Sequence, residues 1–281
     1  MALKKRVYQK GNPLHLVKAA VESVNDIRSS LFLAKQLAIR DIKSQYRQSF
    51  LGIIWAIIMP LTTGAVWIFL NLTGTIRLTE TGVAYPVFAF AGTLIWSIIT
   101  ASINLPMNST NAAKSILSKI NFPKEALLIS GIIKMLFDTF FKVLLLLIFL
   151  YVFDVGYSTS LFYFPLALLG TILCGITVGL FIAPFGLIYK DIAKVISLVL
   201  RFTMYITPVV YIIPKEGLMK SIMELNPFTP LILTTRDTLV GSDPMHLNYY
   251  LILVAVCVPF LFIGLVFYRI SIPIIIERIN A

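Results

Sequence analysis

Charged residues are scarce in this sequence, and their scarcity excludes a water-soluble globular protein. Asp, Glu, Lys and Arg make up 13% of the 281 residues, whereas 58% are hydrophobic. A soluble domain carries about 25% charged residues, so this chain has too little polar surface to cover a globule in water. The composition therefore predicts an all-α protein that crosses a membrane several times.

The groups that support catalysis are also missing. No G-x-x-x-x-G-K-[ST] phosphate loop occurs, so the chain does not bind ATP by that route. The two histidines, His15 and His246, and the two cysteines, Cys174 and Cys257, form no metal-binding cluster. Both cysteines fall in apolar runs, and we interpret them as small core residues rather than as a disulfide. We therefore expect no enzyme activity, cofactor or metal in this chain.

The surplus of basic residues lies at one end. The formal net charge is +11, and ten of the 24 Lys and Arg residues precede residue 50. A basic surface can attract nucleic acid, but a basic flank on an apolar body is typical of membrane orientation. We predict no nucleic-acid partner, a cytoplasmic N-terminal segment over residues 1–50 and a transmembrane domain over residues 51–281.

Six stretches are apolar over the roughly 20 residues that a membrane crossing needs. They cover residues 51–72, 83–103, 129–151, 161–188, 192–213 and 251–268. With the N-terminus inside, seventeen Lys and Arg residues fall on the cytoplasmic side and four outside. This asymmetry predicts six spans with both termini in the cytoplasm.

The N-terminal segment contains one clear helical pattern. Ile27, Leu31, Ala34 and Ala38 recur at helical spacing, with polar residues on the other side. The pattern predicts an amphipathic interface helix over residues 27–39. Such a helix lies on the inner face of the membrane or packs on other protein.

A second polar segment, residues 104–125, follows the second predicted span. Its polar run 108–111 supplies capping side chains for a short helix over residues 112–120. Phe122-Pro123 then ends that helix. On the cytoplasmic face, it is either a docking element for a partner or a plain connector.

The outer segment between the fifth and sixth spans, residues 214–248, is too apolar for a solvated loop. Pro214, Pro227 and Pro230 divide it into pieces too short to cross the bilayer. We interpret it as a re-entrant helical hairpin, with an interfacial loop as the alternative. Non-helical backbone at membrane depth needs protein or a water-filled cavity around it.

The charged side chains Lys134, Asp138, Lys142 and Arg201 lie well inside the predicted spans, whereas Lys194 lies at the cytoplasmic edge of the fifth. The first three are spaced four residues apart, so they share one helix face that should point into the bundle or an aqueous path. They either neutralise one another at a helix interface or line a functional path. Arg201 needs an acceptor from another span, or it reaches the inner interface.

Residues 40–61, RDIKSQYRQSFLGIIWAIIMPL, resemble the entry into the first span of type-2 ABC exporter permeases, the membrane subunits that export O-antigen, capsule and teichoic acid polymers. The matching positions are Arg40, Asp41, Tyr46, Ser49, Leu51, Gly52, Trp55 and Pro60. Later matches, each weak singly, are Phe122-Pro123, Asp191, Pro208, Val209, Tyr211, Asn226-Pro227 and Arg236. Lys190 departs from the pattern, because the family more often has Arg there and Lys lacks its bidentate geometry.

The resemblance implies a half-transporter in the bacterial inner membrane. Two copies of this chain would form a pore, and two copies of a separate ATPase subunit would bind ATP and Mg and drive it. The implied substrate is a polysaccharide on an undecaprenyl-type carrier lipid, moved from the cytoplasm to the exterior among the membrane lipids.

The resemblance also implies roles for particular residues. Coupling to the ATPase is expected at Asn108, Asn111, Lys114, Ser115, Lys119, Lys190 and Asp191. The interface helix and cytoplasmic entrance are expected to use Arg40, Asp41, Tyr46 and Trp55. The candidates for the channel or gate, where aromatic rings can stack on sugars, are Trp67, Trp96, Tyr205, Tyr211, Asn226, Pro227 and Arg236.

Three other functions fit parts of the pattern. A drug or small-lipid exporter would belong to the same family, but the long basic N-terminal segment favours a polymer. An ion-coupled secondary transporter would need inverted repeats around a midplane ion site. No repeat is visible between the halves, and Asp138 is the only acidic residue within the predicted spans. A membrane-embedded enzyme would need the catalytic cluster that this sequence lacks.

Overall fold

The computed structural model describes residues 16–47, 49–74, 82–117, 122–156 and 158–280. Within these ranges every regular element is a helix. The long helices are α1 (Leu16–Arg47), α2 (Trp55–Leu72), α3 (Tyr85–Ala112), α5 (Glu125–Val152), α6 (Phe164–Ile188), α7 (Lys190–Tyr205) and α10 (Leu247–Asn280). The shorter elements are η1 (Gly52–Ile54), α4 (Lys114–Leu117), η2 (Thr159–Tyr163), α8 (Leu218–Leu225) and α9 (Phe228–Val240).

Five helical stretches of the described chain are long and apolar enough to cross a membrane. They are Gly52–Leu70, Tyr85–Ala112, Glu125–Val152, Thr159–Ile188 and Leu247–Ile275. They coincide with the first four and the last of the six predicted spans. The all-helical, multi-pass architecture expected from the sequence is therefore confirmed.

Helix α7 differs from the predicted fifth span. It has 16 residues, which gives about 24 Å of helix against about 30 Å of hydrocarbon. It ends at Tyr205, and the chain from Ile206 to Pro214 is irregular. The expected span over residues 192–213 is thus a shorter helix followed by non-helical backbone.

Helix α3 forms the centre of the bundle, and α6 packs closely along it. Phe90, Leu94 and Ile98 of α3 belong to the largest buried apolar cluster. The close approach uses glycines of α6, because a Cβ at Gly175 or Gly179 would overlap α3. Small residues four positions apart let two membrane helices pack at short range.

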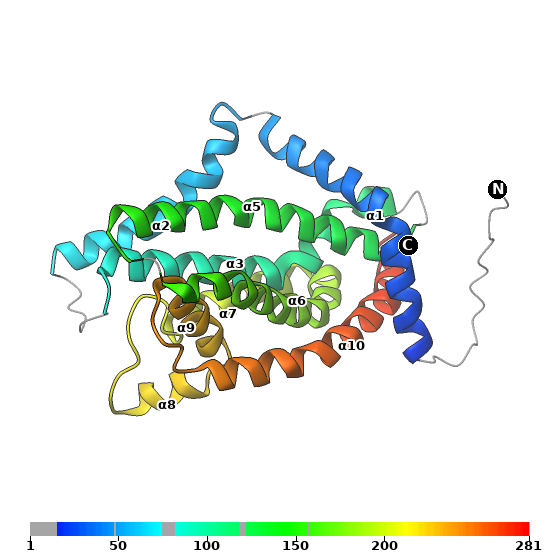
Figure 1. Ribbon diagram of the computed structural model, residues 1–281. Helices are drawn as coiled ribbons and strands as arrows, with labels where there is room; N and C mark the ends of the chain where they lie inside the picture. Colours follow the sequence, from blue (N-terminus) through cyan, green and yellow to red (C-terminus); the bar gives the residue numbers. More distant parts are fainter. Residues whose placement is uncertain (1–15, 48, 75–81, 118–121, 157, 281) are drawn as a thin grey trace.

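Helix α1 and the last turns of α10 lie at the opposite end of the bundle from the short helices α8 and α9 (Figure 1). Helix α1 runs across the end of the bundle where α10 finishes. Ala34, Leu37 and Ala38 of α1 are buried, whereas Leu31 and Phe32 are exposed. The predicted interface helix is thus the middle of a longer helix.

The predicted coupling helix over residues 112–120 differs from the structure. Helix α3 continues through the polar run to Ala112, and α4 follows over Lys114–Leu117, whereas residues 118–120 of the prediction lie outside the described residues. Ser109 and Thr110 do not cap a new helix, because their hydroxyls donate to the carbonyls of Leu105 and Pro106 within α3.

Candidate transport and coupling sites

Most of the predicted coupling residues gather at the end of the bundle where α10 finishes. Asn108 and Asn111 lie in the last turns of α3, and Lys114 opens α4; all three are exposed. Asn111 and Lys114 line a small recess with Leu187 of α6, three residues before α7. The recess places α4 beside the turn between α6 and α7.

Of the remaining predicted coupling residues, Asp191 is the one whose side chain the structure describes. Asp191 in the first turn of α7 is exposed, and its carboxylate lies 3.7 Å from the Lys194 ammonium. Lys119 lies outside the described residues, as do the side chains of Ser115 and Lys190. The described coupling residues therefore face outward at one end of the molecule.

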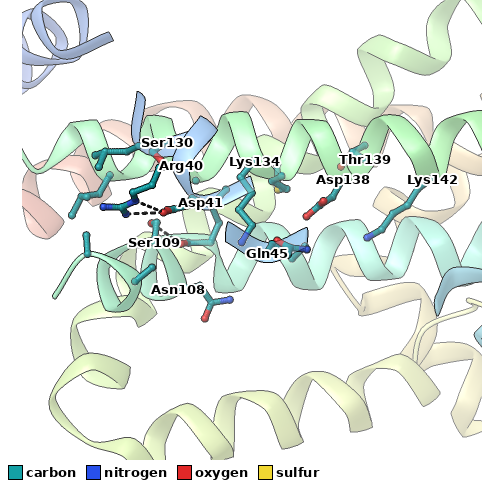
Figure 2. A pocket seen from close by; sticks show the side chains of 18 residues that line it. Arg40, Asp41, Gln45, Asn108, Ser109, Ser130, Lys134, Asp138, Thr139 and Lys142 are labelled. Carbon is teal, nitrogen blue, oxygen red and sulfur yellow. Dashed lines mark hydrogen bonds and ion pairs between the residues drawn. The ribbon is translucent and has the colours of Figure 1, made fainter. Parts of the chain in front are cut away.

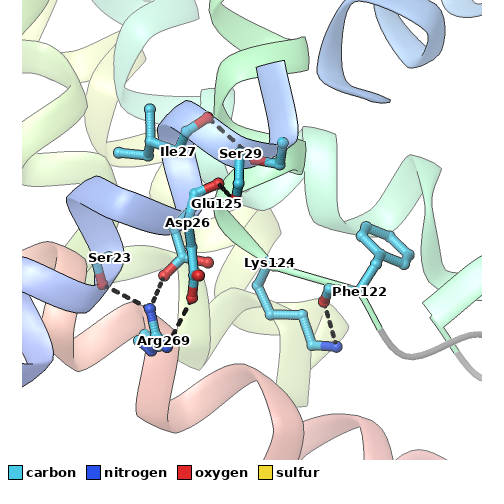
Figure 3. Close-up of polar contacts among 9 residues, drawn as sticks. Ser23, Asp26, Ile27, Ser29, Phe122, Lys124, Glu125 and Arg269 are labelled. Atoms are coloured by element: carbon cyan, nitrogen blue, oxygen red, sulfur yellow. Dashed lines mark hydrogen bonds and ion pairs between the residues drawn. The ribbon is translucent and has the colours of Figure 1, made fainter. Parts of the chain in front are cut away.

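A buried cluster of ion pairs joins α1 to α5 and α10 at the end of the bundle where the predicted coupling residues lie (Figure 3). Arg269 of α10 donates from Nη2 to Asp26 of α1 at 2.9 Å and from Nη1 to Glu125 of α5 at 2.8 Å. The same Nη1 donates to Ser23 Oγ at 3.2 Å. Asp26 and Glu125 are 8% and 3% exposed, so one guanidinium is shared by two buried carboxylates.

Tyr268, the residue before Arg269 on α10, contacts the chain on the other side of residues 111–124, which we call the coupling segment. The Tyr268 hydroxyl is hydrogen-bonded to the Thr110 hydroxyl near the end of α3, and both side chains are buried. Tyr268 and Arg269 therefore hold the chain before and after residues 111–124. Sequence reasoning missed this cluster, because nothing in the pattern of one Asp, one Glu and one Arg links positions so far apart.

Lys124 closes the coupling segment where it enters α5. Its Nζ donates to the Phe122 carbonyl at 3.1 Å and lies 5.4 Å from the centroid of the Phe122 ring (Figure 3). Burial lowers the pKa of Lys124, and the adjacent Glu125 carboxylate raises it by a smaller amount. The bend at Phe122-Pro123 is thereby held against the start of α5.

The intramembrane charges of α5 line a groove between α1, α3 and α5 (Figure 2). Lys134, Asp138 and Lys142 follow one another along α5, and their side chains extend toward α3 and α1. This cavity has a volume of about 290 Å3. Polar side chains of α1 and α3 share its lining, namely Arg40, Asp41, Gln45, Asn108 and Ser109, and so do Ser130 and Thr139 of α5.

A second cavity, of about 380 Å3, adjoins the first and extends it between α2 and α3. Gln45, Asp138 and Lys142 line both. The second cavity is further lined by Tyr46 and Trp55. The four residues predicted at the cytoplasmic entrance, Arg40, Asp41, Tyr46 and Trp55, thus all lie along one groove.

Asp138 does not pair closely with either lysine. Lys142 donates instead to Ser97 Oγ at 3.0 Å, and the Tyr46 hydroxyl donates weakly to Asp138 at 3.4 Å. Burial, and then the charge of Asp138, raises the pKa of Tyr46, so its hydroxyl keeps its proton. Arg40 donates from Nε and Nη2 to one oxygen of Asp41, at 2.8 and 2.6 Å.

At the opposite end, the predicted gate residues hold the irregular chain behind α7. Arg236 is 3% exposed; its Nη1 donates to the carbonyls of Pro208 and Val209, at 3.3 and 3.2 Å. Its guanidinium lies 3.6 Å from the centroid of the Phe88 ring. The arginine thereby satisfies two backbone acceptors of the irregular chain that follows α7.

Asn226 has a matching role between α8 and α9. Its Nδ2 donates to the Ile206 carbonyl at 3.1 Å and to Thr207 Oγ1 at 2.8 Å, while its Oδ1 accepts from the Phe228 amide. Pro227 follows and is exposed. Asn226 therefore joins the end of α7 to the start of α9.

The aromatic gate candidates occupy different environments. Trp96 is buried and meets Phe228 edge-to-face, with 5.6 Å between ring centroids. Trp67 and Tyr211 are partly buried against the same apolar cluster. Tyr205 is exposed at the end of α7, where its carbonyl accepts from the Tyr211 hydroxyl. Arg201 is exposed on α7 and lies apart from the groove.

Comparison with known proteins agrees with this architecture. Residues 33–240 match the family of ABC-2 type transporters. The chain belongs to this family. In this ABC-2 permease the match runs from the middle of α1 to the last residue of α9 and includes the groove and the described coupling residues. The resemblance inferred from residues 40–61 is thereby confirmed, and with it the interpretation as a multi-pass transport permease.

Curated relatives are similar over most of the chain. An O-antigen export system permease protein RfbA of Klebsiella pneumoniae is 25% identical over 215 residues, which cover 75% of this chain and 80% of that protein. A protein of the same name from Myxococcus xanthus is 24% identical over 196 residues, covering 69% of this chain and 74% of the relative.

Proposed function

We propose that this ABC-2 permease is the membrane-spanning subunit of an ATP-driven exporter in the bacterial inner membrane. Its cargo is a lipid-linked polysaccharide of the O-antigen type, moved outward from the cytoplasm. The observation that carries the proposal is the family match over residues 33–240, together with relatives named for O-antigen export. Capsule and teichoic acid polymers are the alternative cargo within the same chemistry.

The energy source is a separate subunit. The sequence has no phosphate loop of its own, so ATP and Mg belong to an ATPase partner. We infer two copies of this chain and two of the ATPase, as in a half-transporter. The exposed residues Asn108, Asn111, Lys114 and Asp191, which lie at one end of the bundle, are the surface for that partner.

The path of the chain supports six crossings with both termini in the cytoplasm. Helix α7 starts beside the recess lined by Leu187 and Lys114. It ends where Asn226 bonds to Ile206, at the end occupied by α8 and α9. It therefore passes from one end of the bundle to the other, although it is shorter than the five long spans. Helix α9, packed inside that outer end, is the re-entrant element.

Co-purification tests the proposal. The tagged full-length chain, extracted in mild detergent, is expected to carry an equimolar subunit with a phosphate-loop motif. Vesicles containing both are expected to need ATP and Mg for transport of a lipid-linked glycan. A chain that purifies without an ATPase, while its own oligomer survives, and transports in response to an ion gradient would overturn the proposal in favour of a secondary transporter.

A further inference from the structure

The groove along α5 has the composition of an anion site. We propose that it binds the phosphate or pyrophosphate group of a membrane lipid, held between Lys134 and Lys142. This inference rests on the proposed function, because a lipid-linked cargo carries such a group. It adds a location, a ligand chemistry and the residues that provide the charge.

The charges of the groove leave a positive surplus. Arg40 and Asp41 neutralise each other through their two short hydrogen bonds. Lys134, Asp138 and Lys142 then remain, with a net charge of +1. Within the described chain, Lys134 forms no ion pair or hydrogen bond, and Lys142 bonds only to the neutral hydroxyl of Ser97. A charge inside an apolar helix is costly without a counter-ion, so an anion is the complement that this groove lacks.

The neutral part of the lining fits phosphate oxygens. Two side-chain amides provide donors: Gln45 lines both cavities beside Lys142, and Asn108 lines the first cavity with Lys134. Phosphate oxygens accept several such bonds, and those from an ammonium are the strongest. Asp138 stands between the lysines and repels an anion, so binding stays weak enough for a transported group to leave.

The surroundings favour a lipid over a soluble phosphate. Trp55, Met59 and Pro60 of α2 line the second cavity. A phosphate in the groove therefore has apolar side chains within reach for the hydrocarbon chain attached to it. Inorganic phosphate would gain only the polar contacts.

The two lysines lie at different depths. Lys134 is nine residues, or about 14 Å, along α5 from its start at Glu125, and Lys142 is about 12 Å further along. The start of α5 lies at the same end of the bundle as the coupling surface. A phosphate group that enters beside Lys134 and passes to Lys142 would thus move from the cytoplasmic side toward the middle of the membrane.

Binding of defined lipids to the purified full-length chain tests the site. The probe is a fluorescent polyprenyl phosphate, and the control ligand is the polyprenol with the same chain and no phosphate. K134Q/K142Q is expected to weaken binding of the phosphate lipid by at least about tenfold and to leave binding of the polyprenol unchanged. D138N is expected to strengthen binding of the phosphate lipid. K35Q is the matched control, since Lys35 is exposed on α1 outside the groove.

Each outcome decides one point. Equal binding by K134Q/K142Q and wild type, within twofold, overturns the site. Displacement of the lipid by equimolar inorganic phosphate overturns its lipid character. Should the double variant misfold by size-exclusion, the single K134Q variant serves instead, because Lys134 has no described partner to lose. If the ATPase co-purifies but the lysine variants bind the lipid as wild type does, the phosphate site is overturned and the proposed function stands. If no ATPase co-purifies but the lysine variants lose lipid binding, the proposed function is overturned and the phosphate site stands.

Discussion

Replacing Arg269 with alanine is expected to destabilise the protein severely while removing only one side chain. The guanidinium makes the three hydrogen bonds to Asp26, Glu125 and Ser23, and its side chain is 15% exposed. R269A removes the positive charge that contacts both buried carboxylates. Breaking a buried ion pair from one side costs about 3–5 kcal/mol, which corresponds to a fall in Tm of about 6–15 °C for a protein of this size.

The assay is a thermal scan of the full-length chain in detergent, read as the monodisperse fraction by size-exclusion. The neutral combination D26N/E125Q/R269Q is expected to recover more than half of the lost Tm, because no buried charge remains unpaired. R28A is the matched control, since Arg28 is exposed on α1 two residues from Asp26, and it should change stability by less than about 0.5 kcal/mol. A fall below 2 °C for R269A, or no recovery in the triple variant, would refute the reasoning.

Three further variants probe the two ends of the bundle. R236K keeps the charge but loses the planar guanidinium that stacks on the Phe88 ring and holds Nη1 against the Pro208 and Val209 carbonyls, so it should cost about 1–3 kcal/mol in the same thermal scan. G92A places a Cβ onto the Val209 carbonyl and should cost about 1–3 kcal/mol; an unchanged Tm would contradict that packing. K114E should reduce co-purification of the ATPase, whereas K220E, the same change at the other end on α8, should not; equal effects would count against the coupling surface.

Hydropathy was sufficient for most of the fold. Five of the six predicted spans appear as long apolar helices. A run of about 20 apolar residues is both long enough to cross the hydrocarbon core and apolar enough to lie in it. The fifth span was the exception. Its apolar run continues to Ile213, but Pro208 cannot donate to a helix, and the chain leaves the helix at Tyr205.

Local polar chemistry was harder to predict. Asn108, Ser109 and Thr110 are typical helix-capping residues, yet the two hydroxyls bond within α3, which therefore continues to Ala112. Capping residues mark a helix start only where the preceding backbone leaves the helix, and the sequence does not determine that.

In the groove, too, helical spacing predicted which side chains share a helix face but not which partners they bond to. Helical spacing correctly placed Lys134, Asp138 and Lys142 on one inward face. It did not determine that Lys142 would bond to Ser97 rather than to Asp138, because that choice depends on how far α3 lies from α5. Likewise, the pairing of Arg269 with Asp26 depends on where two distant helices cross.

The hydrogen bonds from Arg236 and Asn226 to residues 206–209 make α7 and the outer helices mechanically one part. Helix α7 has few partners along its length, since Val195, Leu198, Val199 and Phe202 are exposed. Its far end, in contrast, is fastened to α9 at four backbone or hydroxyl acceptors. Under the proposed function, a tilt of α7 that begins at Asp191 would therefore carry α8 and α9 with it, because these hydrogen bonds hold the irregular chain behind α7 to the outer helices.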